Sequence, residues 1–226
     1  MFFYENIPTK KVYYIGEYFF MTSQFETFVK HPWHGISPGA KAPHELNVFI
    51  EILPTDIIKY EVDKDSGFLK IDRPQKFSNH CPSLYGFIPK TYSGALSGEH
   101  AGKVLGRTGV QGDGDPLDVC VLASYPIHQS GIILTSIPIG GLRMIDKEEA
   151  DDKIICVLKN DDVYGRAKDI SDIPEVLIRK LKHYFLTYKA IPFEEETPTV
   201  EIPEVYGAKE AIVVINKALE DYKNSF

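Results

Sequence analysis

The chain has 226 residues, and its 25 lysines and arginines against 32 aspartates and glutamates give a formal net charge of −7 with the histidines neutral. This balance argues against nucleic acid as the main partner, because phosphate backbones are held by clustered Lys and Arg side chains. Apolar residues make up 43% of the chain, which is typical of a globular protein with a sizeable core, and the length favours one domain.

The cysteines and the apolar runs indicate where the protein works. Cys81, Cys120 and Cys156 are odd in number and set among apolar residues, the pattern of reduced thiols, so we expect a cytoplasmic location. No run of about 18 apolar residues is present, and the first twenty residues lack the pattern of a signal peptide. We therefore expect no contact with a membrane.

Residues 1–44 are rich in Pro and Gly without periodicity, and we expect an irregular N-terminal extension there, followed by a single domain over residues 45–226. The domain opens with short runs of β-branched and aromatic residues separated by turn signals, which predict an antiparallel β core. A Gly-rich segment at about 91–112 is expected to be one long inserted loop. The expected strands cover residues 46–53, 57–62, 67–72, 117–123, 132–145 (with a bend near Pro138) and 154–158.

Two helices are expected near the end of the chain. Apolar residues recur at three- and four-residue steps after Asp172 as far as Tyr188, with Pro174 near the first turn, and again from about Ala208 to Tyr222. Strands first and helices last indicate an α+β fold, a small closed or OB-like β-barrel core flanked by two C-terminal helices.

The most informative segment is Gly112-Asp-Gly-Asp-Pro-Leu-Asp118, just before an apolar run. Carboxylates this close repel one another unless a cation lies between them, so Asp113, Asp115 and Asp118 could face one hard metal ion. An EF-hand is the obvious competitor, but Asp118 stands where that loop needs glycine. An ordinary solvated acidic turn is the other alternative.

Charged residues elsewhere favour a site over a solvated turn. Glu51 interrupts an apolar strand, and Lys59 and Glu61 share one face of the next strand. With these companions the chain resembles the family I soluble inorganic pyrophosphatases, whose D-x-D-P-x-D signature matches Asp113 to Asp118. The companions in matching order are Glu51, Lys59-Tyr60-Glu61, Asp72-Arg73, Tyr85-Gly86, Asp146, Asp151, Lys153 and Tyr188-Lys189.

The resemblance implies hydrolysis of inorganic pyrophosphate to two orthophosphates by direct attack of a metal-activated water, with several Mg²⁺ ions. It implies that Asp115 is the catalytic base, and it places Glu61 at the edge of the site. A homo-oligomer, hexamer or dimer, is also implied. The implied metal ligands are Asp113, Asp118, Asp146, Asp151 and Glu51, and the implied substrate-binding residues are Lys59, Arg73, Tyr85, Lys153, Tyr188 and Lys189.

Two positions depart from the family pattern. Cys81 replaces a common tyrosine four residues before Tyr85, and Lys147 replaces a common acidic residue after Asp146. Two other functions remain as alternatives: a non-enzymatic barrel that binds an acidic metabolite or a divalent ion, and a hydrolase of another phosphoanhydride. Metal ligands spread over three segments together with four cations disfavour the non-enzymatic barrel.

Overall fold

The structure is a computed structural model, and it describes residues 30–189 and 200–226. The compact unit begins at His31 and ends at Phe226. Its strands are β1 (Leu46–Ile52), β2 (Ile58–Val62), β3 (Leu69–Pro74), β4 (Leu84–Phe87), β5 (Gln111–Gly112), β6 (Asp118–Leu122), β7 (Ile132–Asp146), β8 (Glu149–Ala150), β9 (Lys153–Leu158) and β10 (Val200–Gly207). Its helices are α1 (Ala95–Leu105), α2 (Glu175–Thr187), α3 (Ala208–Ser225) and the short 3-10 helix η2 (Ile170–Asp172).

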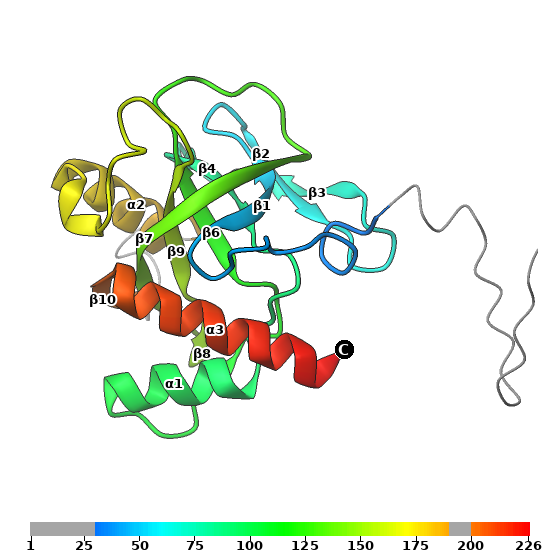
Figure 1. Cartoon of the computed structure of the whole chain (residues 1–226), viewed down its shortest axis with the longest axis vertical. Helices are drawn as coiled ribbons and strands as arrows, with labels where there is room; N and C mark the ends of the chain where they lie inside the picture. The colour runs from blue at the N-terminus through cyan, green and yellow to red at the C-terminus, as the bar shows by residue number, and fades with distance from the viewer. Residues whose placement is uncertain (1–29, 190–199) are drawn as a thin grey trace, which may run out of the picture. The chain divides into compact units, whose positions relative to one another are not determined.

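Five strands form a ring at the centre of the fold (Figure 1). The order is β1-β4-β6-β9-β7, and β7 closes the ring by pairing with β1. β6 and β9 run parallel, while the other ring pairs are antiparallel, so the sheet is mixed and is not a strict barrel. The expectation of an α+β fold with a small closed, OB-like β core is confirmed.

β7 is long enough, at 15 residues, to pair with both β1 and β9, and β10 adds to its outer half. The expected bend is a register shift between Pro138 and Gly140. Any side chain at Gly140 or Gly141 would collide with Tyr206, so the two glycines let β10 approach closely. The lysine and arginine residues that face the site from β2 and β3 belong to a separate two-stranded hairpin sheet.

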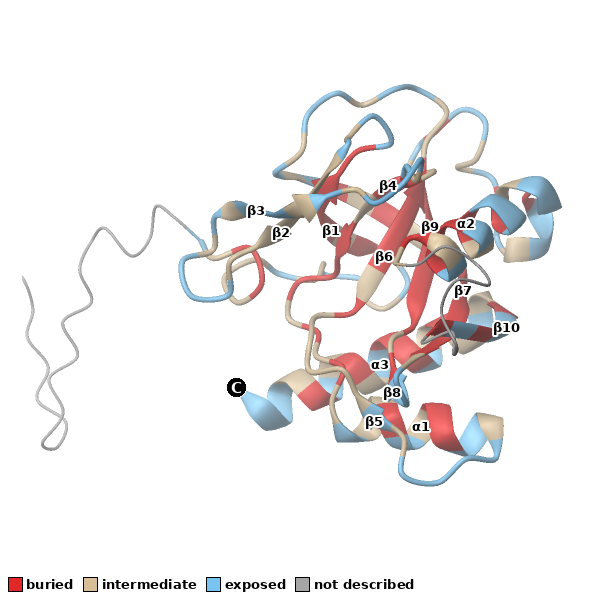
Figure 2. Ribbon diagram, turned by 180° about the vertical axis from the view of Figure 1, so that it is seen from behind, coloured by how far each residue is buried: buried red, intermediate tan, exposed pale blue. Residues whose placement is uncertain are grey.

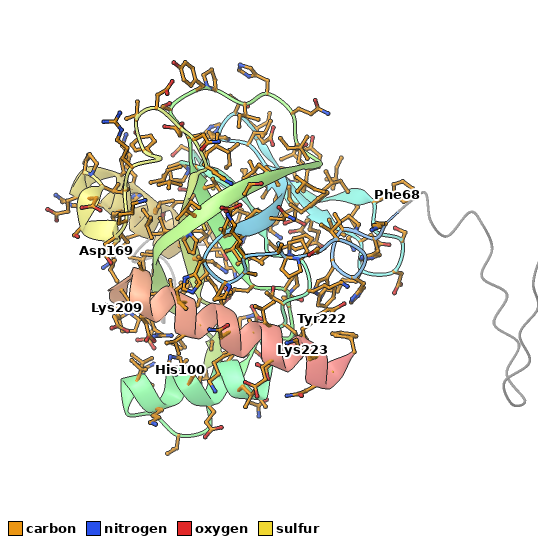
Figure 3. The ribbon with its side chains drawn as sticks, in the orientation of Figure 1. Phe68, His100, Asp169, Lys209, Tyr222 and Lys223 are labelled. Atoms are coloured by element: carbon orange, nitrogen blue, oxygen red, sulfur yellow. The ribbon has the colours of Figure 1, made fainter. Side chains whose placement is uncertain are left out.

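The expectation of one long loop at 91–112 is wrong, because this segment contains the helix α1. Gly98 lets the helix pack closely against the chain that follows it, because a Cβ there would come within 2.6 Å of the Gln111 backbone. Asp221 of α3 caps the start of α1 by accepting hydrogen bonds from the backbone N–H groups of Gly94, Leu96 and Ser97. α1 and α3 lie side by side in Figure 1, and His100 of α1, labelled in Figure 3, forms a hydrogen bond with Glu210 of α3.

The helices cover the ring on different sides. Ala211, Ile215 and Ala218 of α3 pack with Val48, Ile50 and Val119 inside one core cluster. Leu181 and Phe185 of α2 pack with Leu142 and Ile155 in another. Figure 2 shows the buried residues concentrated on the ring strands and on the inward faces of these helices. No helix in the described ranges is long and apolar enough to cross a membrane.

The beginning of the described chain lies within the compact unit. The expected N-terminal extension includes residues 31–44, but Trp33 is 5% exposed and packs with Phe49 and Phe87 inside the compact unit. The rest of that expected extension, residues 1–29, lies outside the described residues. The compact unit therefore begins about fourteen residues earlier than the boundary expected from composition.

Candidate active site

The Asp113–Asp118 segment forms a loop that is fixed to the backbone around Ser93. Ser93 N–H donates to the Asp115 carbonyl at 2.8 Å, and Gly114 N–H donates to the Ser93 carbonyl at 3.0 Å. Gly114 has φ +77°, a conformation that glycine adopts without strain. The Asp113 carboxylate accepts the Asp115 N–H at 3.0 Å, which closes a tight turn within the loop. These hydrogen bonds fix the backbone of the loop, and with it the positions from which the aspartate side chains extend.

Lys153 lies at the centre of the buried part of the site. It is the first residue of β9, it is 2% exposed, and it lies opposite Asp118 in the parallel pairing of β6 and β9. Its Nζ donates to Asp118 Oδ2 at 2.6 Å and also to Asp151 Oδ1. Tyr85 of β4 donates its hydroxyl to the same Asp118 oxygen at 2.5 Å. Three neighbouring ring strands thus bring these residues together.

Asp113, Asp118 and Asp151 lie around Lys153 and form with it what we call the inner cluster. When ionised, these three carboxylates carry more negative charge than Lys153 alone can balance. Burial and then the Asp151 charge raise the pKa of Asp113 to about 8. Burial also raises the pKa of Asp151, despite the opposing charge of Lys153. Burial alone would lower the pKa of Lys153, but the Asp118 and Asp151 carboxylates raise it. Raised carboxyl pKa values beside a fully charged lysine indicate that the cluster can accept further positive charge.

The hairpin carries the second group of charged side chains. Lys59 of β2 donates to Asp72 Oδ2 at 2.6 Å and to Glu61 Oε2 at 3.2 Å. Arg73 lies with its guanidinium 5.9 Å from the ring centre of Tyr188. Glu51 connects the ring to the hairpin, because its carboxylate accepts the Val62 N–H at 2.6 Å. Burial raises the pKa of Glu51 to about 8.

Asp146 and Lys189 form a third group at the far end of β7. Lys189 donates to Asp146 Oδ2, while Asp146 Oδ1 is buried and has no hydrogen-bond partner among the residues described. Tyr188 is 8% exposed, and the Lys189 ammonium lies 5.2 Å from its ring centre. Lys147, one of the departures from the family pattern, is exposed in the turn after Asp146.

A cavity of about 560 Å³ lies beside the inner cluster. Asp115 lies on its wall and is half-exposed, in contact with Lys64. Among the residues expected at the site, the wall includes Glu51, Lys59, Glu61, Tyr85, Asp115 and Asp118. The other expected residues do not line this cavity: Asp113, Asp151, Lys153, Arg73, Asp146, Tyr188 and Lys189.

The donor set suits a hard cation. Asp146 keeps one buried oxygen without a hydrogen-bond partner among the described residues, and burial, then the Asp151 charge, raises the pKa of Asp113, so both carboxyl groups would gain from a nearby cation. Carboxylate oxygens are the protein ligands that Mg²⁺ prefers. Between residues 30 and 189 and from 200 onward, however, no three acidic, His or Cys side chains converge in ready-made ligand geometry. Within the inner cluster, the Lys153 ammonium itself occupies the space between Asp118 and Asp151.

From the sequence no role is expected for two residues at the site: Asp72, which is named only as a companion in the family order, and Lys64, which is not named. Asp72 holds Lys59, and Lys64 contacts Asp115. Asp72 stands beside Arg73 at the end of an expected strand, which is a usable signal. Lys64 lies in a polar turn, where a lysine is ordinarily solvated, so no local signal distinguishes it.

The chain matches known proteins over most of its length. A family model described as inorganic pyrophosphatase matches residues 48–223. The inorganic pyrophosphatase of Chlamydia trachomatis serovar L2 is 52% identical over 201 residues, covering 88% of this chain and 96% of that protein. Soluble inorganic pyrophosphatase 2 of Chlamydomonas reinhardtii is 35% identical over 196 residues, covering 87% and 90%.

A solved structure agrees with these matches. The crystal structure of inorganic pyrophosphatase from Thermus thermophilus superposes with a TM-score of 0.71 at 30% identity, covering 86% of this chain and 99% of that one. The family signature, the relatives and the fold coincide over the same residues. The chain belongs to the family I soluble inorganic pyrophosphatases.

Proposed function

We propose that the protein hydrolyses inorganic pyrophosphate to two orthophosphates with Mg²⁺ as cofactor. One observation carries the proposal: the half-buried carboxylates of Asp118 and Asp151 share the buried Lys153, with Asp113 beside them, next to a cavity of about 560 Å³. Such a cluster suits a polyanionic substrate only when further cations arrive with it. The names of the relatives support the same substrate.

Asp113, Asp118, Asp146, Asp151 and Glu51 are the residues that would hold Mg²⁺. When bound, the ions would supply positive charge to the phosphate oxygens and lower the pKa of a bound water. The buried carboxylates with raised pKa values support this assignment, because a cation lowers the free energy of their charged forms.

Asp115 is the proposed base. It is the aspartate of the signature loop that lies half-exposed on the cavity wall, so its carboxylate can reach a water in the cavity. Its backbone carbonyl and N–H are both hydrogen-bonded, which fixes the position from which the side chain extends. Asp115 would take the proton of the water as that water attacks phosphorus.

Phosphoryl oxygens would be bound by Lys59, Arg73, Lys153 and Lys189, together with the hydroxyls of Tyr85 and Tyr188. Arg73 can grip two oxygens with its planar guanidinium, while each lysine acts as a point charge. Since phosphoryl transfer needs mainly positioning and charge stabilisation, this set of donors is sufficient for the protein's part.

The cysteines are poor candidates for a covalent route. Cys81, Cys120 and Cys156 are buried and free, and burial raises the pKa of Cys81 to about 11 and that of Cys156 to about 12. Neutral buried thiols are weak nucleophiles, which favours direct attack by water. Three free thiols also support a cytoplasmic location, and the family resemblance supports a homo-oligomer, hexamer or dimer.

The test is orthophosphate release from pyrophosphate, with and without Mg²⁺. We expect turnover that depends on the metal, and its absence would overturn the proposal. Asp115→Asn keeps the size of the side chain but removes the base, so kcat should fall by about 10² to 10⁴. Mg²⁺ binding, measured by calorimetry, should stay close to the wild type. A near-normal kcat would remove Asp115 from the catalytic role.

A further inference from the structure

The only tryptophan of the chain, Trp33, stands in the wall of the active-site cavity. It lies outside the residues that match the family model, and it is fixed by its indole N–H, which donates to the Thr91 carbonyl at 2.7 Å. The Lys64 ammonium lies 5.9 Å from the centre of the Trp33 ring, within the range of a cation–π contact. A segment that composition assigned to an extension therefore touches the site.

The segment from His31 to Ile36 also holds the turn that carries Lys64. His31 Nε2 donates to the Lys64 carbonyl at 3.0 Å, while Nδ1 of the same ring accepts the Trp33 N–H at 3.1 Å and the His34 N–H at 3.3 Å. These partners require the tautomer with the proton on Nε2. His34 Nδ1 lies 2.8 Å from the hydroxyl of Tyr222, a residue near the end of α3 that Figure 3 labels.

The turn fits closely against this segment. Gly67 ends the turn with φ +75°, and a Cβ there would come within 2.8 Å of the His31 ring and 2.9 Å of Pro32. Asp63 closes the turn by accepting the Ser66 N–H at 3.0 Å. An exposed lysine ordinarily samples many rotamers, but here its backbone is held from two sides and its ammonium rests between Trp33 and Asp115.

The lysines of the cavity wall differ in how much hydrogen-bonding capacity they have left. Lys59 contacts two carboxylates, Glu61 and Asp72, and Lys70 contacts Glu61 and Asp63. The Lys64 ammonium contacts only Asp115 among the described carboxylates, and its side chain is 56% exposed. An ammonium has three donors, so Lys64 can bind a further anion without leaving Asp115.

We propose that Lys64 is a further substrate-binding residue, which binds a phosphoryl oxygen next to Asp115, and that the segment from His31 to Ile36 positions it. This inference rests on the proposed function. Lys64 joins the proposed base to the substrate, because the same ammonium contacts the Asp115 carboxylate and faces the cavity where the substrate would lie.

The experiment combines kinetics with a binding measurement that needs no turnover. Because Trp33 is the sole tryptophan and touches Lys64, its fluorescence can follow the binding of Mg²⁺-imidodiphosphate, a pyrophosphate analogue that resists hydrolysis. For Lys64→Met we expect KM and the dissociation constant for the analogue to rise roughly tenfold, the effect of losing one charge-assisted hydrogen bond, with kcat changed by less than about threefold.

Lys64→Arg keeps the charge and should restore most of the affinity. Trp33→Leu, followed by kinetics alone, should raise KM in the same direction by a smaller factor, since the ammonium remains. Lys41→Met is the matched control, because Lys41 is an exposed lysine whose ammonium pairs with Glu45 away from the cavity wall. Its KM and affinity should equal those of the wild type.

The inference is overturned if Lys64→Met keeps KM and affinity within about twofold of the wild type, or if Lys64→Arg fails to differ from Lys64→Met. A wild type that does not hydrolyse pyrophosphate, yet binds the analogue in a Lys64-dependent way, would overturn the proposed function and support this binding role.

Discussion

The ring and the hairpin hold their charged side chains in different ways. On the ring, Lys153 is 2% exposed and is shared by carboxylates from neighbouring strand ends. On the hairpin, Lys59 and Arg73 are each 25% exposed, and their partner Asp72 is 31% exposed. The ring therefore supplies a buried cation held by half-buried carboxylates, while the hairpin supplies cations that water can still reach. Removing a charge should affect folding in the first case and mainly substrate binding in the second.

Lys153→Met should have the largest effect. It leaves the half-buried carboxylates of Asp118 and Asp151 without the buried cation between them, so the free energy of unfolding should fall by about 3 kcal/mol in EDTA. Urea unfolding followed by circular dichroism measures this change. Added Mg²⁺ should recover part of the loss if it binds the same carboxylates in the folded state.

Lys159→Met is the control for this variant, because Lys159 lies just after β9 and pairs with Glu45 at 36% exposure. Its effect should stay below about 1 kcal/mol. Equal stability losses for the two variants would contradict the contrast between buried and accessible charges.

Gly86→Ala tests the rigidity of the ring itself. Gly86 of β4 lies opposite Ile50 of β1, and an added methyl group would collide with the Phe49 carbonyl. We expect a loss of about 1–3 kcal/mol, because a packed backbone cannot move aside. Gly109→Ala is a comparison without a clash, since its methyl group would meet nothing within 4 Å. Its positive φ alone should lower the free energy of unfolding by about 1 kcal/mol. A smaller loss at Gly86 than at Gly109 would show that the strands can separate.

Lys59→Met should alter binding more than folding. Its ion pairs are partly exposed, so the free energy of unfolding should change by less than about 1 kcal/mol. KM for pyrophosphate should rise roughly tenfold, because a charged donor to the substrate is lost. Steady-state kinetics and urea unfolding of the same preparation separate the two effects. A stability loss as large as that of Lys153→Met would remove the distinction.

The smallest effect concerns the pH dependence of the hairpin turn. The Ser66 hydroxyl, the Ser66 N–H and the Lys70 ammonium lower the pKa of Asp63 to about 2 from its usual 3.8. A lowered carboxyl pKa stabilises the folded state above the unfolded value, and this contribution is lost as the pH falls from about 4 toward 2. In Asp63→Asn the free energy of unfolding should therefore fall less steeply as the pH is lowered through that window. If the free energy of unfolding of both proteins depends on pH in the same way over this window, the Asp63 charge does not stabilise the turn.

Sequence patterns revealed the ring more readily than its surroundings. Runs such as Val119 to Leu122 are continuously apolar because both of their faces are buried, so their strands were recognisable. α1 was missed because Gly98 and Gly102 lower helix propensity, and only contact with the backbone of residues 107–111 explains them. β10 was missed because Pro203 argues against a strand, although here it stands at a register shift.

Residues of the site were likewise recognisable where they form a sequence pattern, and not where folding alone brings them together. Asp113, Asp115 and Asp118 form a local pattern that sequence can show, and their companions were recognisable through family order. Lys64 and Trp33 could not be recognised in this way, because their contact with each other and with Asp115 exists only once the hairpin folds against the start of the compact unit. Contacts between distant segments leave no local signal.

The cap that Asp221 provides for α1 has a consequence for synthesis on the ribosome. The backbone N–H groups of Gly94, Leu96 and Ser97 donate to the Asp221 carboxylate, which is translated more than 120 residues later. Until the last turns of α3 leave the exit tunnel, the start of α1 has unsatisfied donors, and a short isolated helix is marginal in water. A nascent chain arrested before Asp221 should thus leave α1 open to proteases, while the ring strands translated earlier are already available to pair.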